Sequence, residues 1–276
     1  MDITIVLTTS PHRYGKHDDM IALSIASLKE FGFADCPIII CADGINKKSR
    51  FFRERSKSSD YKIYLNSIKK KFKNVEFIIN EKHLGLTKNL ESGLRKVKTT
   101  YCFPFQHDLG LSPKFVQIDL QDKINKLVKS KIKFYAFRRA YEVSQDNYIQ
   151  EWFRGAKFSD DEFWSVEHSL GAYAGYGFQD HACLVRPQDY MEVIRNEYDE
   201  NKTMFIEDSI QEEMRGFTRG DYDDWEKYAV AIDGVNRLVY HLDGHSKAGN
   251  DLEYEKVWSQ GICHPHIIED YTNWCK

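Results

Sequence analysis

Short apolar runs alternate with longer amphipathic stretches over the first part of the chain. The apolar runs are Asp2–Leu7, Pro37–Cys41, Val75–Asn80 and an aromatic stretch that begins at Tyr101. The nearly continuous apolar character of the first two runs and of the aromatic stretch is typical of strands that are buried on both faces, and Val75–Asn80 is expected to be a third strand. Between the first two runs, Ile21, Ile25 and Leu28 recur at helical spacing and predict an amphipathic helix that ends near Gly32. Strand, helix and parallel strand make a βαβ unit, so the pattern predicts an α/β fold.

Polar residues follow three of these runs, at the point where each strand is expected to end. They are Thr8-Thr9-Ser10-Pro11, Ala42-Asp43-Gly44 and Gln106-His107-Asp108. In open α/β sheets, ligands bind in the crevice beyond the carboxyl ends of the strands. The hydroxyls and amides after the first strand could hydrogen-bond a nucleotide, and Asp43 could reach its ribose or base. Asp108 could bind Mg²⁺ or Mn²⁺ together with phosphate oxygens. A plain surface loop is the alternative at each position.

A glycine-containing loop, Gly85-Leu86-Thr87-Lys88, leads from the third strand into a predicted helix. The backbone amides at the start of a helix favour anions, and Lys88 adds a positive charge beside them. The loop could therefore hold a pyrophosphate. The alternative is an ordinary capped surface helix.

The second half predicts further helices and strands and carries a second group of acids. The expected elements are a helix at Phe115–Val128, strands at Phe134–Arg138, Gly177–Arg186 and Arg237–Tyr240, and a helix that starts at Pro187. Glu207 and Asp208 follow an apolar pair and precede another predicted helix. Acids in the first turn of a helix are also favoured by its macrodipole. An aromatic-rich region between residues 152 and 176 could pack on sugar rings, although most aromatic side chains belong to a core.

Composition narrows the class of protein. With 276 residues, of which 42% are hydrophobic, the chain can bury the core of one large domain or two small ones. A net charge of -3 argues against a nucleic-acid binder. Basic residues cluster from Lys47 to Lys73, which indicates a solvated helix face or, as the sharper alternative, a peripheral contact with an anionic membrane or a phosphorylated acceptor. Six scattered cysteines without CxxC spacing indicate a reducing cytosol, and neither a transmembrane helix nor a secretory leader is visible.

The ordered set of strand ends resembles the nucleotide-sugar-binding half of GT-A glycosyltransferases, and most of all the inverting family 2 type. The resemblance covers about the first 110 residues and implies a Rossmann-like nucleotide-binding fold with a mixed central sheet. It also implies a nucleotide-sugar site made by Thr8, Thr9, Ser10, Asp43, Gly85, Thr87, Lys88 and His107. The loop matches a common family variant, but His83 and Glu91 stand where asparagine is more usual. Of the family's Asp-x-Asp motif, here Gln106-His107-Asp108, only the last acid is kept.

The resemblance further implies one domain over residues 1–276, with a nucleotide-sugar-binding half to residue 110 and an acceptor-binding half from 111. In such enzymes Asp208 would be the base that takes the acceptor proton, and Glu207 would orient the site or the acceptor. His241 or His245 would complete a metal site with Asp108. The implied reaction transfers a sugar from a nucleotide diphosphate sugar, with UDP as the expected nucleotide, to a hydroxyl of a glycan or glycolipid. It proceeds with inversion, depends on Mn²⁺ or Mg²⁺, and suits a cytoplasmic enzyme of polysaccharide biosynthesis.

Two rival functions remain open at the level of sequence. A sugar-phosphate nucleotidyltransferase has a related fold but usually carries a glycine-rich loop with Arg and Lys directly after the first strand, whereas Thr8-Thr9-Ser10-Pro11 has no glycine. A non-catalytic carbohydrate-binding protein that kept the fold is the other rival, because Gln106 stands where the family has an acid.

Overall fold

The computed structural model describes residues 1–11, 18–46, 58–137, 172–175, 178, 182–199, 205–214, 216–217, 222–233 and 238–242. Within these residues, eight strands form one mixed sheet in the order β3-β2-β1-β4-β8-β6-β9-β7. The strands of the first half, which all run parallel, are β1 (Ile3–Thr9), β2 (Ile38–Ala42), β3 (Glu76–Ile79) and β4 (Tyr101–Gln106). The predicted α/β fold with a mixed central sheet is confirmed.

The second half extends this sheet beyond β4. Its strands are β6 (Phe134–Ala136), β7 (Ala172–Gly175), β8 (Cys183–Val185) and β9 (Val230–Asp233). The strand β8 is antiparallel to both β4 and β6, and β6 is parallel to β9, so β6 and β9 run in the direction of β1. Six parallel strands therefore end at one edge of the described sheet, which we call the carboxyl edge. A separate antiparallel pair consists of β5 (Leu109–Leu111) and β10 (Val239–His241).

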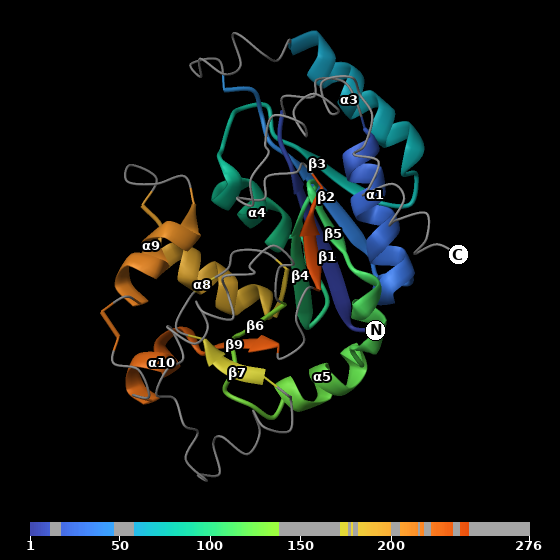
Figure 1. The fold of residues 1–276 in the computed structure, drawn as a ribbon. Helices are drawn as coiled ribbons and strands as arrows, with labels where there is room; N and C mark the ends of the chain where they lie inside the picture. Colours follow the sequence, from blue (N-terminus) through green and yellow to red (C-terminus); the bar gives the residue numbers. More distant parts are fainter. Residues whose placement is uncertain are drawn as a thin grey trace, which may run out of the picture.

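Helices cover both faces of the sheet (Figure 1). One face carries α1 (Asp19–Leu28), α3 (Ser58–Lys71) and α5 (Leu120–Leu127), and the other carries α4 (Leu86–Leu94), α8 (Pro187–Glu197) and α9 (Ile206–Met214). The shorter α10 (Tyr222–Tyr228) leads into β9, η1 (Lys29–Phe33) continues α1, and η2 (Pro113–Gln117) precedes α5. No helix in the described residues is long and apolar enough to cross a membrane.

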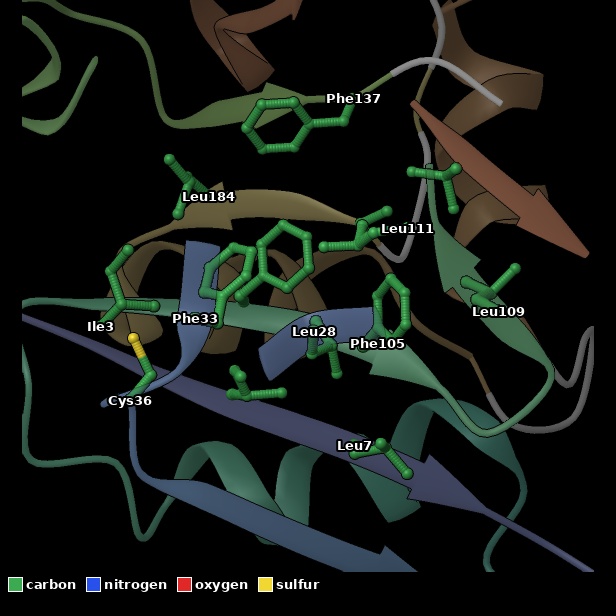
Figure 2. Packing of buried hydrophobic residues seen from close by; sticks show 14 of the residues in the cluster. Ile3, Leu7, Leu28, Phe33, Cys36, Phe105, Leu109, Leu111, Phe137 and Leu184 are labelled. Atoms are coloured by element: carbon green, nitrogen blue, oxygen red, sulfur yellow. The ribbon is translucent and has the colours of Figure 1, made fainter. Parts of the chain in front are cut away.

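The core has two layers because successive side chains of a strand point to opposite faces of the sheet. From β1, Ile5 and Leu7 enter the layer beneath α1 and α3, whereas Val6 enters the layer beneath α4 and α8. Figure 2 shows the first layer, in which Leu7 and Phe105 from the sheet lie with Leu28 of α1. Burial on both faces explains why β1, β2 and β4 read as continuous apolar runs. The edge strand β3 is instead exposed or half-buried.

Buried thiols occupy several positions in these layers. Cys36, Cys41, Cys102 and Cys183 are all buried and unbridged, and such small thiols pack well inside an apolar layer. Burial raises the pKa of the Cys41 thiol to about 12. Cys263 and Cys275 lie outside the described residues.

Some predicted boundaries were wrong. The first strand does not stop at Leu7 but continues through Thr9, because both threonines pair with β2 and suit a strand. The helix expected at Phe115–Val128 is divided into η2 and α5, since the Asp119 side chain accepts a hydrogen bond from the Asp122 N–H at 2.9 Å and caps α5. Of the strand expected at Gly177–Arg186, the described part contains only β8.

Candidate functional site

The carboxyl edge contains a topological switch point between β1 and β4. The chain proceeds from β1 outward through β2 to β3 and then returns to the other side of β1 as β4. Ligands of open α/β sheets bind at such a point, beyond the carboxyl ends of the strands. The carbonyl oxygen of Thr8 accepts a hydrogen bond from the His107 N–H at 3.0 Å, and that of Thr9 accepts one from the Asp43 N–H at 2.8 Å. The expectation that these strand ends lie together is confirmed.

The threonine hydroxyls at the end of β1 are directed into the protein. The hydroxyl of Thr8 donates to the carbonyl of Phe105 at 3.2 Å, and Thr9 shares a 2.7 Å hydrogen bond with the hydroxyl of Tyr64 in α3. Both threonines are buried, and Ser10 is half-buried. Contact of these three residues with a nucleotide stays a prediction. The tyrosines of the basic helix α3 were not predicted to belong to the strand ends.

Asp43 fastens the loop that precedes α4. Its carboxylate accepts hydrogen bonds from the backbone N–H groups of Gly44, Leu84 and Gly85 at 2.8, 2.7 and 3.1 Å. Nδ1 of His83 lies 2.8 Å from the same carboxylate but off the direction of a hydrogen bond. Only 2% of Asp43 is exposed, so a contact with a ribose or base stays a prediction and would require the carboxylate to exchange one of these partners.

A glycine is needed at position 44 because the loop passes very close to it. A Cβ atom there would lie 2.2 Å from the carbonyl carbon of Lys82. The backbone at the end of β2 and the loop before α4 are therefore held side by side, and Ile45 forms a parallel bridge with Lys82.

The start of α4 is fixed directly to the strand ends. Asn89 is buried, and its side-chain amide donates to the carbonyl of Cys41 at 2.9 Å and to that of Thr9 at 3.4 Å. Its Oδ1 accepts from the amide of Asn80 at 2.9 Å. A Cβ atom on Gly93 would lie 2.4 Å from Cγ1 of Val6, so α4 packs on the sheet more closely than any other residue would permit. In the sequence, the only signal for these hydrogen bonds of Asn89 is a polar residue on the apolar side of the helix.

Lys88 already has partners within the protein. Its ammonium lies 2.8 Å from the carboxylate of Glu91 and 5.8 Å from the ring centroid of Tyr198. Burial disfavours the charge on Glu91, but the hydrogen bonds from Lys88 and Arg95 outweigh it and lower the pKa of Glu91. A contact of Lys88 with a pyrophosphate stays a prediction and would compete with this ion pair.

The predicted acid pair lies in the first turn of α9, beside the start of α4. The N–H of Ile206 donates to the hydroxyl of Thr87 at 3.0 Å, which joins segments 119 residues apart. Asp208 is exposed, whereas Glu207 is half-buried and accepts a hydrogen bond from the Gln211 side chain at 3.2 Å. Gln211 also donates to the carbonyl of Phe178 at 3.0 Å. The structure thus joins the turn that holds these two acids of the second half to the start of α4.

Backbone contacts of Asp108 and His241 locate the predicted metal site. Asp108 lies in the turn between β4 and β5, and its carbonyl accepts a hydrogen bond from the Leu242 N–H at 2.6 Å. His241 pairs with Leu109 in the neighbouring strand, so Asp108 and His241 belong to adjacent strand ends. His245 lies outside the described residues, as does most of the aromatic-rich region. Within the described residues, no three side chains of His, Cys, Asp or Glu gather as metal ligands, so metal binding stays a prediction.

Comparisons with known proteins find solved structures that are weakly similar to this chain. No family model and no curated protein matches the chain. Among solved structures, S. aureus TarS is 10% identical with a TM-score of 0.49, and the match covers 87% of this chain and 36% of that one. Residues 1–349 of S. aureus TarS with UDP-GlcNAc match at 10% identity and a TM-score of 0.49, and the match covers 94% of this chain and 65% of that fragment. The same fragment with UDP is 9% identical with a TM-score of 0.47, and the match covers 87% of this chain and 60% of that one. The chain thus spans about a third of TarS, and a likeness this distant carries no argument about its ligands.

Proposed function

We propose that the chain is a glycosyltransferase that moves a sugar from a nucleotide diphosphate sugar, with UDP as the nucleotide, to a hydroxyl of a glycan or glycolipid. The observation that supports the proposal most is the 3.0 Å hydrogen bond from the Ile206 N–H to the hydroxyl of Thr87, which joins the turn containing Glu207 and Asp208 to the start of α4. One side of that site would bind the donor and the other would hold the acceptor hydroxyl.

In the proposed inverting reaction, the exposed carboxylate of Asp208 takes the proton of the acceptor hydroxyl. The acceptor oxygen forms a bond to the anomeric carbon as the bond from that carbon to the diphosphate oxygen breaks on the opposite face. The proton ends on Asp208, and the electron pair leaves with the nucleotide diphosphate. Glu207, which accepts a hydrogen bond from Gln211, orients the site or the acceptor.

A divalent cation belongs to the proposal through the resemblance alone. Mn²⁺ or Mg²⁺ bound by Asp108, with His241 or His245, would neutralise charge on the leaving diphosphate. The proposal is tested by treating the active protein with EDTA and then adding Mn²⁺. Loss and recovery of transfer would support it, and unchanged turnover in EDTA would exclude a metal requirement.

The direct test of the function measures release of nucleotide diphosphate from a panel of nucleotide sugars with glycan and glycolipid acceptors. We expect Asp208→Asn to lower kcat by about 10²-fold to 10⁴-fold, because the general base is lost, without a change in melting temperature. Glu212→Gln is the matched control, since Glu212 is an exposed acid on the same helix. It should stay within about twofold of wild type. Turnover of Asp208→Asn at the wild-type rate would contradict the proposed base.

A non-catalytic carbohydrate-binding protein is the second candidate. It is favoured by the internal partners of Asp43 and of the hydroxyls of Thr8 and Thr9, which occupy groups that the family uses for the nucleotide. A donor that raises the melting temperature but is never turned over, with any acceptor tried, would select this candidate.

We also propose that the protein is cytoplasmic and touches an anionic membrane through its basic segment. On the described part of that segment, Lys62, Lys69, Lys70 and Lys73 are all exposed. Lysines near an anionic surface each contribute about 1 kcal/mol of attraction. The protein should therefore sediment with phosphatidylglycerol vesicles and not with phosphatidylcholine vesicles, and Lys69→Glu with Lys70→Glu should abolish this. Reversal of the exposed Lys96 and Lys98 is the control, and equal losses in both variants would reject a specific contact.

A further inference from the structure

We propose that Thr87 is a positioning residue that sets the place of Asp208 by capping α9 from another part of the chain. This inference rests on the proposed function, because it assigns a role in transfer to a hydroxyl that the resemblance would have placed on the donor phosphates. The contact that carries it is the hydrogen bond from the Ile206 N–H to the hydroxyl of Thr87 at 3.0 Å.

The N–H of Ile206 needs an acceptor from outside its own helix. The first four N–H groups of an α-helix have no partner within it, and Ile206 is the first residue of α9. A side chain just before the helix usually supplies the acceptor for the second or third N–H, and the first N–H needs another partner. Here a threonine 119 positions earlier accepts this hydrogen bond, and both residues are buried, Thr87 at 1% and Ile206 at 0% exposure. Water therefore has little access to replace the hydroxyl.

Thr87 is itself held rigidly, so it can act as a reference point. It lies in the first turn of α4, two residues before Asn89, whose amide bonds to the carbonyls of Cys41 and Thr9 at the strand ends. One turn later, Gly93 packs against the sheet without room for a Cβ atom. A continuous set of contacts thus leads from the switch point through Thr87 to Ile206, two residues before Asp208.

The hydrogen bond between Thr87 and Ile206 should affect the rate of sugar transfer. A general base must lie within hydrogen-bond reach of the proton that it takes, and a displacement of about 1 Å can cost about 10²-fold in rate. Glu207 and Asp208 belong to the turn that begins at Ile206, so a shift of this turn moves both acids. In the proposed site the donor is held by the strand ends, whereas the hydroxyl of Thr87 is engaged by the Ile206 N–H. Loss of the cap should therefore lower kcat and leave the donor KM unchanged.

Three variants test the inference on the full chain. Thr87→Val keeps the shape but removes the acceptor, and Thr87→Ser restores the acceptor. Thr4→Val is the matched control, because Thr4 is a buried threonine whose hydroxyl accepts a 2.8 Å hydrogen bond from Thr99 at the opposite edge of the sheet. We expect Thr87→Val to lower kcat by about 10-fold to 100-fold with a donor KM within about twofold of wild type. Thr87→Ser and Thr4→Val should keep a wild-type kcat.

Amide hydrogen exchange over residues 206–210 gives a readout that does not depend on activity. Exchange should accelerate in Thr87→Val and stay at the wild-type rate in Thr87→Ser and Thr4→Val. If wild type transfers no sugar, the proposed function fails while the exchange data still decide the cap. Unchanged exchange in Thr87→Val would overturn the cap. Faster exchange with an unchanged kcat, or a raised donor KM at constant kcat, would overturn the positioning role.

Discussion

The two edges of the sheet hold their polar side chains in different ways. At the carboxyl edge, Asp43, Thr87 and Asn89 are at most 2% exposed, and each bonds to the backbone of a segment far away in the sequence. At the opposite edge, where β6 and β9 begin, an open groove of about 660 Å³ is lined mainly by Lys and Arg side chains and their acidic partners. There, Lys131 pairs with Glu226 at 2.8 Å, with side-chain exposures of 60% and 43%.

This difference shows which edge can keep an accurate geometry. A buried hydrogen bond to the backbone fixes both groups, because leaving either one unpaired away from water costs free energy. An exposed ion pair contributes about 0 to 1 kcal/mol and is screened by salt. The carboxyl edge therefore holds its polar groups in the more accurate geometry, and the basic groove opposite offers cations that already have acidic or carbonyl partners.

The largest effect is expected at Asp43. Asp43→Ala would leave three backbone N–H groups without their acceptor, so we expect the free energy of unfolding to fall by about 3 kcal/mol. Asp43→Asn keeps one acceptor oxygen and should lose about half as much. Urea denaturation at pH 7 measures both values.

The control for this prediction is Asp2 at the opposite edge. Its exposed carboxylate accepts a single hydrogen bond from the Thr100 N–H at 3.1 Å, so Asp2→Ala should cost less than about 0.5 kcal/mol. Equal losses for Asp2→Ala and Asp43→Ala would remove the distinction between the two edges.

A smaller effect is expected from alkaline pH. Burial raises the pKa of Tyr64 above its ordinary value of 10.0, the hydrogen bond with Thr9 opposes this, and the nearby charges of Asp18 and Asp108 add to it. Because the folded pKa is raised, the stability contributed by the neutral hydroxyl is full below pH 10 and is lost as the pH rises further. The free energy of unfolding should fall by about 1.4 kcal/mol per pH unit for this tyrosine.

Comparison of wild type with Tyr64→Phe isolates the contribution of Tyr64 to the pH dependence of the free energy of unfolding. Urea denaturation between pH 8 and pH 11 should give a flatter alkaline slope for the variant, although its stability at pH 7 should be about 1 kcal/mol lower through loss of the bond to Thr9. Parallel curves above pH 10 would show that Tyr64 ionises in the folded protein as readily as in the unfolded chain.

The sequence predicted the first half of the fold well because local pattern and environment agree there. The buried strands β1 and β2 require continuous apolar runs, and α1 and α4 show helical spacing, so these elements were found with small boundary errors. The edge strand β3 was found as well, although its side chains are exposed or half-buried. The position of Glu207 and Asp208 at the start of a helix was also predicted correctly. Apolar and polar periodicity is sufficient for such elements.

Long-range contacts could not be predicted in this way. Nothing local to Thr87 indicates that its hydroxyl accepts from Ile206, and nothing local to Tyr64 indicates a bond to Thr9. The short strands β7 and β9 were missed because their stability comes from pairing and not from their own pattern. The residues that fix the candidate site are therefore those that sequence pattern alone leaves least visible.

The smallest effect is expected at the ion pair between Lys131 and Glu226. A double-mutant cycle with Lys131→Ala and Glu226→Ala should give a coupling energy of about 0.5 kcal/mol at low salt, because both side chains are largely in water and lose conformational freedom on pairing. At 1 M salt the Debye length is about 3 Å, so the coupling should fall close to zero. Urea denaturation of the four proteins at both salt concentrations provides the measurement. A coupling above about 2 kcal/mol that survives in 1 M salt would show that this edge also contains a rigidly held polar pair, and geometry alone would then no longer favour the carboxyl edge as the site.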